Sequence, residues 1–359
     1  MNFTLHLTAD CNLACRYCYE THGKSHMTEE TAKKAVDLAF AYGHSKNGFS
    51  LFGGEPMLER GVIESVCRYA AEKSQAAGTE LRFKMTTNGT LLDETFLRFA
   101  NEHNLEIALS HDGLLQDVQR ITRGGKPTMT RLEPIVDLLL SYQPKAVAMQ
   151  TVMPSTVDRM AESVEWLYNR GFTRINTAID YRVDAGWDDA SMEELGRQYE
   201  RIATLSEQHF DDARPLHYLN FLSKISAYLN DRPCLECKLG MRQPSVTPDG
   251  KIYPCNQFLD VAEYCMGDVE SGIDREKQRA IYRASLDPEP DCEGCAIADR
   301  CRHHCACLNF SLTGRMHDVA PVQCEHERIL IPIADGLAAR LYEKKSARFL
   351  LNYREDPLE

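Results

Sequence analysis

The first 180 or so residues alternate short runs of β-branched and aromatic residues with longer segments whose apolar residues recur at helical spacing. The short runs predict strands over residues 2–7, 49–52, 80–85, 105–109, 146–152 and 174–179. The longer segments predict helices over residues 29–42, 61–76, 93–101, 131–140 and 158–170. Strands separated by helices of this length form right-handed βαβ units and a parallel sheet. Six units are too few for a closed eight-stranded barrel, so we expect an α/β fold, a partial (β/α)6 TIM-like barrel.

The pattern changes towards the C-terminus. Residues 192–210 and 216–229 read as helices, but after Pro233 the periodicity fades and turn residues dominate. Ten of the fourteen cysteines also lie beyond Pro233. We therefore predict a barrel over residues 1–188, a helical bridge over 189–232 and a small domain over 233–359 that metal holds together. Within it, residues 325–342 have helical spacing and should pack back on the body.

Composition excludes several classes of function. The net charge of −12 argues against nucleic acid as a partner, because phosphate binding requires clustered Lys and Arg. No apolar run reaches the roughly 20 residues of a membrane span, so we expect no membrane partner. The N-terminus lacks the basic and apolar regions of a signal peptide, which indicates a cytoplasmic protein. In such a chain, fourteen cysteines are more consistent with metal ligands than with disulfides.

Three cysteines, Cys11, Cys15 and Cys18, follow the first predicted strand in the spacing C-x3-C-x2-C. Thiolates hold iron–sulfur clusters, and four are needed to close a 4Fe–4S cube. Three ligands leave one iron open to a substrate or cofactor, whereas structural zinc prefers four closed ligands. Chemistry in barrels of this kind collects at the C-terminal ends of the strands, so the spacing predicts an open cluster at the mouth of the barrel.

A second motif, Gly53-Gly54-Glu55-Pro56, ends the second predicted strand. Gly-Gly and Pro mark turns in general, and a strand-to-helix turn is the simpler interpretation. Because the motif follows a parallel strand beside the cysteine loop, we interpret it instead as ligand-binding backbone. Glycine lets a small molecule approach the main chain, where free carbonyls could accept hydrogen bonds from an ammonium group.

Together these motifs resemble those of the radical S-adenosylmethionine (SAM) enzymes, including the aromatic Tyr17 before the last cysteine. The resemblance implies a 4Fe–4S cluster on the three cysteines, with SAM chelating the open iron. It implies that Gly53, Gly54 and Glu55 hold the methionine amine. Reduction of the cluster would then cleave SAM to a 5′-deoxyadenosyl radical that abstracts a substrate hydrogen.

The ends of later predicted strands carry further segments that are similar to this family. By resemblance, Ser110 is a ligand of the ribose hydroxyls, with Thr87 and Asn88 close by. Arg120 is a candidate partner of the cofactor carboxylate. Turn chemistry is the alternative for each segment, because Asn-Gly and Asp-Gly form turns in their own right.

The C-terminal cysteines form the second constellation. Its eight members are Cys234, Cys237, Cys255, Cys292, Cys295, Cys301, Cys305 and Cys324. Eight thiols close two 4Fe–4S clusters, although CxxC pairs can also bind zinc. The arrangement resembles the SPASM extension of radical SAM enzymes, which implies two auxiliary clusters and three clusters in all. By resemblance, Cys234, Cys237, Cys255 and Cys305 hold the first, and Cys292, Cys295, Cys301 and Cys324 hold the second. The short separation of Cys234 and Cys237 leaves open whether both are ligands.

Three further cysteines have other expected roles. Cys67 shares a helical face with Ile63, so we expect a core thiol. Cys265 and Cys307 lie beside the ligand segments and could be spare thiols, alternative ligands or hydrogen-atom donors. We do not expect His303 or His304 to be a metal ligand.

The SPASM resemblance implies a peptide or protein substrate. The leading hypothesis is maturation of a ribosomally made peptide by a thioether, carbon–carbon or carbon–oxygen crosslink, with a flavodoxin or ferredoxin as reductant. The main alternative is anaerobic sulfatase maturation, in which the family carries an Asp base after a Tyr-Pro-Cys segment. This chain has Asn256 there, and an amide cannot take a proton at neutral pH, which favours crosslinking.

Other hypotheses remain from the sequence. A peptide epimerase would use Cys265 or Cys307 as the hydrogen donor, and a protein of a different class would be a non-catalytic electron carrier.

Because the first predicted strand begins at residue 2 or 3, we expect no N-terminal leader-binding domain. Recognition would then come from a separate leader-binding protein, from the barrel or from a short substrate.

Overall fold

A nine-stranded sheet forms the centre of the protein. The computed structural model describes residues 2–230, 238–286, 292–302 and 305–353. The strand order is β7-β6-β5-β4-β3-β2-β1-β8-β9. Its strands are β1 (Asn2–His6), β2 (Lys46–Phe52), β3 (Glu80–Thr87), β4 (Leu105–Ser110), β5 (Val147–Val152), β6 (Arg174–Ile179), β7 (His217–Tyr218), β8 (Ser245–Val246) and β9 (Ile252–Tyr253). Strands β1 to β7 pair in parallel, which confirms the six predicted strands and the α/β partial barrel.

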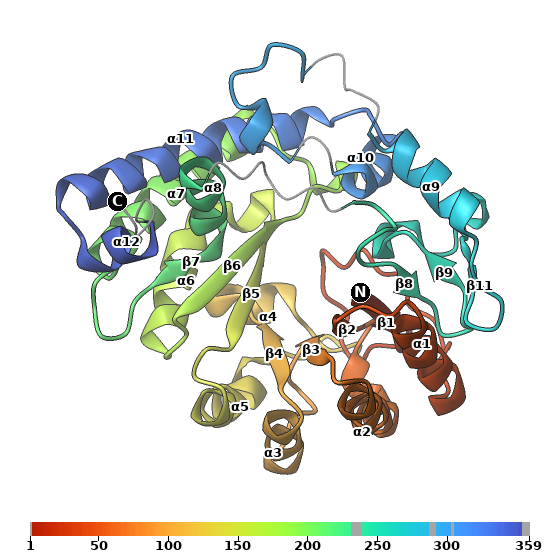
Figure 1. Cartoon of the computed structure of the whole chain (residues 1–359). Helices are drawn as coiled ribbons and strands as arrows, with labels where there is room; N and C mark the ends of the chain where they lie inside the picture. Colours follow the sequence, from red (N-terminus) through yellow and green to blue (C-terminus); the bar gives the residue numbers. More distant parts are fainter. Residues whose placement is uncertain (1, 231–237, 287–291, 303–304, 354–359) are drawn as a thin grey trace.

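Helices cover the outer face of the sheet. They are α1 (Glu29–Ala41), α2 (Arg60–Ala77), α3 (Glu94–Glu102), the short α4 (Gln116–Gln119), α5 (Met129–Tyr142) and α6 (Met160–Asn169). In Figure 1 the strands form an arc, with α1, α2, α3 and α5 along its outer side. Local sequence sets the helix ends: the Asp93 side chain accepts a hydrogen bond from the Phe96 amide at the start of α3, and Gly78 ends α2 in a left-handed conformation.

The apolar core lies between the sheet and these helices. Phe3, Leu5 and Phe83 on the strands are at most 1% exposed. Full burial of such a side chain stabilises the fold by about 1.5–3 kcal/mol. Cys67 on α2 is completely buried in the same core, which confirms the prediction of a core thiol. In the part of the chain that the structure describes, no helix combines the length and apolarity needed to traverse a bilayer.

Later helices lie across the open side of the arc. They are α7 (Asp189–Gln208), α8 (Leu219–Leu229), α9 (Arg275–Ala284), α10 (Ala306–Thr313), α11 (Pro321–Glu343) and α12 (Ala347–Asn352). Helix α11 packs against α7 and α8, which confirms that the tail folds back on the body (Figure 1). The tail therefore brings its side chains to the inner side of the barrel.

The cysteine-rich segment begins by extending the barrel sheet. Strand β8 pairs in parallel with β1, with Thr4 opposite Ser245, and β9 returns antiparallel to β8. A separate hairpin of β10 (Gly267–Asp268) and β11 (Gly272–Ile273) follows. The loop after β1 and the segment after β9 thus start from neighbouring strands. The divisions predicted at residues 188 and 232 stay a prediction.

Candidate active site

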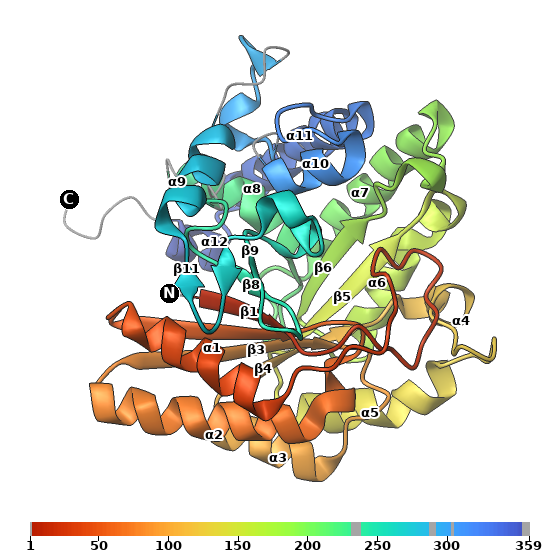
Figure 2. The ribbon, with the colours of Figure 1, turned by 90° about the vertical axis from the view of Figure 1, so that its right-hand side faces the viewer.

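The cysteine loop lies at the C-terminal ends of the parallel strands (Figure 2). Cys11 is buried, and Cys15 and Cys18 are half-buried. The Ala14 and Arg16 amides donate hydrogen bonds to the carbonyls of Ile121 and Gln119, at 2.8 and 3.0 Å. The loop is therefore held in place against the last residue of α4 and the segment that follows it.

All of the predicted cofactor-binding residues line one cavity with the three loop cysteines. The cavity has a volume of about 530 Å³. Those residues are Tyr17, Gly53, Gly54, Glu55, Thr87, Asn88, Ser110 and Arg120. The volume falls within the roughly 300–1,000 Å³ of small-molecule and cofactor sites. Their binding of SAM stays a prediction, but the structure brings every one of them to the same place.

Gly53 and Gly54 are required by the close approach of the cysteine loop. A Cβ on Gly53 would lie 2.3 Å from the Thr8 carbonyl oxygen, and one on Gly54 would lie 2.3 Å from that of Asp10. Gly53 also has a positive φ of 136°. The Gly54 amide donates to Thr8 and the Glu55 amide to Asp10, both at 2.8 Å. The motif thus clamps the backbone of the loop, a role beyond the ligand approach that the sequence suggested.

The Glu55 carboxylate is buried at the end of this clamp. It accepts hydrogen bonds from the Thr87 hydroxyl at 2.6 Å, the Asn88 amide at 2.8 Å and the Met57 amide at 3.0 Å. Burial raises the pKa of Glu55, and these donors oppose the shift. Glu55 therefore ties the end of β3 to the Gly-Gly turn while it faces the cavity.

Asn88 also supports the cysteine loop directly. Its Nδ2 lies 3.9 Å from the Cys11 sulfur and donates to the Asn12 side chain at 2.8 Å. The Leu13 amide points at the same sulfur at 3.4 Å. Such N–H groups stabilise a thiolate ligand, and hydrogen bonds to sulfur tune iron–sulfur clusters. Within the described residues, this donor set fits a cluster ligand at Cys11.

Asp112 is a site residue that the sequence analysis missed. It is completely buried and accepts hydrogen bonds from the Tyr17 hydroxyl at 2.5 Å, Arg120 Nε at 3.0 Å and the Thr151 amide at 2.8 Å. The Arg120 guanidinium lies 5.2 Å from the centre of the Tyr17 ring. The sequence analysis placed this segment at a strand end but assigned a role only to Ser110, with a turn as the alternative for the Asp-Gly pair.

Arg120 brings a positive charge close to the loop thiols. Burial raises the pKa of Cys15 to about 11, and the Arg120 charge opposes this rise. A cluster ligand must be a thiolate, so the nearby cation favours the form that binds iron. The residues present therefore fit an iron–sulfur group at this position.

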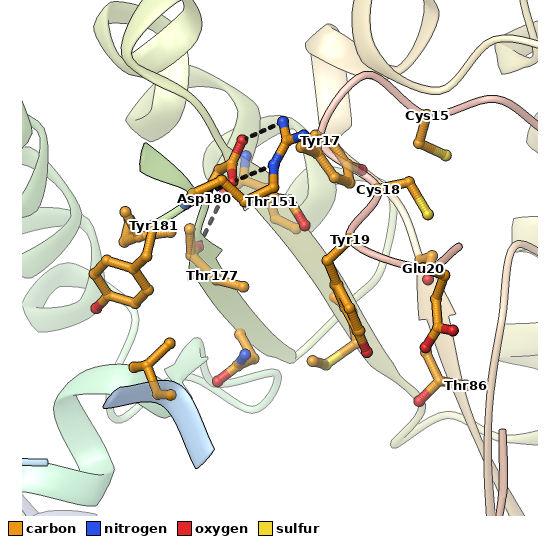
Figure 3. A pocket seen from close by; sticks show the side chains of 18 of the residues that line it. Cys15, Tyr17, Cys18, Tyr19, Glu20, Thr86, Thr151, Thr177, Asp180 and Tyr181 are labelled. Atoms are coloured by element: carbon orange, nitrogen blue, oxygen red, sulfur yellow. Dashed lines mark hydrogen bonds and ion pairs between the residues drawn. The ribbon is translucent and has the colours of Figure 1, made fainter. Parts of the chain in front are cut away.

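The opposite wall of the cavity comes from β6, α8 and α11. Figure 3 shows Thr177 and Tyr181 across the cavity from Cys15 and Cys18, and Asp180 next to Tyr17. The His326 ring lies between two hydroxyls, with Nε2 2.7 Å from that of Tyr199 and Nδ1 in contact with that of Tyr181. The sequence analysis did not single out these residues, although β6 was predicted and its end points to the same edge.

An ion pair is buried beside this wall. Lys224 Nζ lies 2.5 Å from Glu327 Oε2, and both side chains are 2% exposed. Lys224 also donates to the Arg300 carbonyl at 2.9 Å. Asp180, at the end of β6, pairs with Arg182 at 2.9 Å. Charges of both signs therefore line the cavity, and Arg182 reaches the cysteine loop, where it donates a hydrogen bond to the Arg16 carbonyl at 3.1 Å.

The described C-terminal cysteines of the two predicted ligand sets alternate along the chain. Cys292 and Cys295 flank a turn that leads to the buried Cys301, and Cys324 lies in the first turn of α11. Cys255 and Cys305 lie near each other, after β9 and before α10. Cys234, Cys237, His303 and His304 lie outside the described residues. Among those described, no three His, Cys, Asp or Glu side chains are arranged to hold a single metal ion.

Comparisons with known proteins agree with this site. Residues 5–173 match the family described as the Radical SAM superfamily. An uncharacterised protein of Methanocaldococcus jannaschii is 27% identical over 174 residues, which span 48% of this chain and 60% of that protein. A serine-type anaerobic sulfatase-maturating enzyme of Bacteroides thetaiotaomicron is 29% identical over 344 residues, which span 85% of this chain and 82% of that enzyme.

Solved structures show the same fold. The structure of native anSMEcpe with bound AdoMet and Cp18Cys peptide superposes with a TM-score of 0.81 at 18% identity, over 95% of this chain and 99% of that one. Streptococcus suis SuiB bound to precursor peptide SuiA gives 0.63 at 14% identity, over 90% of this chain and 75% of that one. Residues 5–173, which carry the three-cysteine loop and the Gly-Gly-Glu clamp, are therefore a radical SAM domain, and the protein is an enzyme.

Proposed function

We propose that this protein is a radical SAM peptide maturase that installs a crosslink in a ribosomally made peptide. The observation that carries the proposal is the extent of the cavity, which runs from Cys15 and Cys18 to Gln257, Arg302 and Leu308 of the cysteine-rich region. A peptide segment lying in it would contact both cysteine regions at once. Two auxiliary 4Fe–4S clusters in that region belong to the same proposal.

The residues around the loop have separate roles in the proposal. Cys11, Cys15 and Cys18 would hold a 4Fe–4S cluster, which together with SAM would supply the radical chemistry for hydrogen abstraction from the substrate. The Gly53-Gly54 turn fixes the loop and offers main-chain groups to the methionine amine. Arg120 offers a buried positive charge, and Ser110 a hydroxyl for the ribose.

The peptide nature of the substrate is supported by the relatives. One superposed structure holds a peptide as well as AdoMet, and another holds a precursor peptide. The wall formed by Asp180, Arg182, Lys224 and Glu327 carries charges that could orient peptide groups. A flavodoxin or ferredoxin as reductant and a separate leader-binding protein remain part of the proposal.

The position after Cys255 favours crosslinking over formylglycine formation. Asn256 Oδ1 accepts a hydrogen bond from the Ser245 hydroxyl at 2.5 Å. Its neighbour Gln257 lines the main cavity, whereas Asn256 lines a second cavity of about 390 Å³ beside it. An amide held in this way offers no base to a substrate. Sulfatase maturation stays the second candidate, because the sulfatase-maturating relatives cover most of the chain.

The first experiment tests cofactor cleavage. Protein reconstituted with iron and sulfide without oxygen, reduced and mixed with SAM should release 5′-deoxyadenosine. Cys15→Ala should abolish that product and leave the iron of the C-terminal region in place. Cys265→Ala, a change at a thiol outside both predicted ligand sets, is the matched control and should keep the product. Unchanged 5′-deoxyadenosine from the Cys15→Ala protein would overturn the proposal.

The second experiment separates the two candidate reactions. Peptides from small open reading frames beside the gene are incubated with the active enzyme, and the products are fragmented in a mass spectrometer. A crosslink should appear as the loss of two hydrogens and a segment that resists fragmentation. An aldehyde that reacts with a hydrazide would instead show formylglycine and replace crosslinking by sulfatase maturation.

A further inference from the structure

Basic side chains gather around the cysteine loop of an otherwise acidic protein. The chain has a net charge of −12, yet residues 11–19 of the loop and residues 118–128 contain no Asp or Glu. Together these two segments carry four Lys or Arg residues. Arg120 is buried, and the other three, Arg16, Arg123 and Lys126, are exposed. We call these three side chains the loop patch.

Backbone hydrogen bonds join the two segments that carry the loop patch. Leu13 and Thr122 form an antiparallel bridge, and the Ala14 amide donates to the Ile121 carbonyl at 2.8 Å. Beyond the bridge the chain turns back on itself, because the Thr122 amide donates to the Lys126 carbonyl at 2.9 Å. This turn therefore presents its side chains directly beside the cysteine loop.

The cysteine loop has an inner side and an outer side. Leu13, Cys15 and Tyr17 line the main cavity, whereas the residues between them, Ala14 and Arg16, are exposed and lie outside its lining. The loop backbone thus separates the cavity from the protein surface. A protein bound over Ala14 and Arg16 would come close to the thiols from outside, without entering the cavity.

Two charges of the loop patch are available to a partner. Among the residues that the structure describes, none forms an ion pair with the side chain of Arg16 or Lys126. Arg123 pairs with Asp10, and the nearby Asp117 accepts hydrogen bonds from two backbone amides at 2.7 Å. Exposed cations of this kind attract an acidic surface and steer its approach.

The proposed function requires an electron from outside the protein, because iron–sulfur clusters of low potential are reduced only by a strong donor. Electron transfer slows steeply with distance, so the donor must bind close to the cysteine loop. We propose that the loop patch is the docking site of an acidic one-electron donor protein of the flavodoxin class. One electron passes from the flavin hydroquinone of the donor, which is oxidised to its semiquinone, to the cluster of the loop, which is reduced. The inference rests on the proposed function, which includes such a reductant, and it assigns the surface that the reductant binds.

The test compares two electron donors on the full-length reconstituted protein. A reduced bacterial flavodoxin has to dock, whereas dithionite is a small reductant that needs no docking surface. Lys126→Glu and Arg16→Glu each reverse one charge of the loop patch. Lys145→Glu is the matched control, because Lys145 is exposed shortly before β5, at the opposite edge of the sheet. Iron content checks that each variant keeps its clusters.

We expect the release of 5′-deoxyadenosine with flavodoxin to slow by about three- to tenfold in Lys126→Glu and in Arg16→Glu. With dithionite, Lys126→Glu should match the wild type, and Lys145→Glu should match it with both donors. The wild-type rate with flavodoxin should fall as salt is raised, because ions screen the attraction, and both patch variants should depend less on salt. Isothermal titration calorimetry with oxidised flavodoxin should show weaker binding to the same two variants.

Four outcomes would overturn the inference. They are wild-type rates with flavodoxin in both patch variants, a wild-type rate that rises with salt, an equal slowing in Lys145→Glu, and an equal slowing of Lys126→Glu with both donors. The last would indicate damage to the loop and not to docking. A dithionite-reduced wild-type protein that releases no 5′-deoxyadenosine would instead overturn the proposed function. The calorimetric comparison does not depend on that product, so the two failures can be told apart.

Discussion

The Tyr17 hydroxyl donates a hydrogen bond of 2.5 Å to the Asp112 carboxylate. It links the cysteine loop after β1 to the end of β4, and both groups are buried. Asp112 in turn pairs with Arg120 at 3.0 Å. The aromatic residue of the cysteine motif therefore anchors the loop to the barrel and to its buried cation.

Loss of this hydroxyl should weaken the fold and the loop together. Tyr17→Phe removes a hydrogen bond to a charged group, so we expect the free energy of unfolding to fall by about 1.5–3 kcal/mol. Urea unfolding under anaerobic conditions measures the change. Tyr69→Phe is the control, because Tyr69 donates to the half-exposed Asp37 carboxylate at 2.8 Å and should cost about 1 kcal/mol or less. Equal losses in the two variants would contradict the anchoring role.

A methyl group on Gly54 should disturb the cysteine loop. The added Cβ would lie 2.3 Å from the Asp10 carbonyl oxygen, which is backbone and cannot turn aside. We expect Gly54→Ala to lower the free energy of unfolding by about 1–3 kcal/mol and to reduce both loop iron and 5′-deoxyadenosine. Gly61→Ala is the control, because a Cβ there meets no atom within 4 Å. Normal iron in the Gly54→Ala protein would show that the clamp is dispensable.

The buried pair Lys224 and Glu327 should behave as a unit. Lys224→Met leaves an uncompensated buried carboxylate, so we expect a loss of about 3–5 kcal/mol in the free energy of unfolding. The double variant with Glu327→Leu removes both charges and should be more stable than either single variant. Denaturant unfolding of the four proteins completes the cycle. Simple addition of the two single losses would contradict the coupling.

Acid should destabilise the protein through His326. Burial, with the charges of Lys224 and Arg302, lowers the pKa of His326 from 6.5 to about 3. The unfolded chain takes up a proton near pH 6.5 while the folded ring stays neutral, so this stability is complete above pH 6.5. It is lost as the pH falls towards 3, by about 2 kcal/mol between pH 6.5 and pH 5.

Unfolding measurements across this pH range check the prediction. His326→Gln should show a shallower loss of stability with acid than the wild type, because its side chain does not titrate. His44→Gln, at an exposed position, is the control and should keep the wild-type slope. An unchanged slope in the His326→Gln protein would mean that other groups, such as the buried His111, account for the dependence.

Local pattern was sufficient for most of the barrel. The predicted strand 174–179 coincides with β6, and the predicted helix 29–42 extends one residue beyond α1. The pattern missed β7, which consists only of His217 and Tyr218. Two residues are too few to show the alternation of apolar and polar positions that marks a strand. It also missed that β8 joins β1, because that pairing links residues about 240 apart and depends on the path of the whole chain.

The sequence by itself predicted the radical SAM domain of this protein. Three thiols in one short loop and a Gly-Gly-Glu turn are local features. They can therefore be recognised even where the predicted ends of the strands are wrong. Only the tertiary structure decided that Asp112 joins Tyr17 to Arg120 and that His326 and Glu327 of the tail reach the cavity. These contacts join segments that are far apart in the chain. They depend on how the barrel curves and how α11 packs across it, and residue spacing encodes neither.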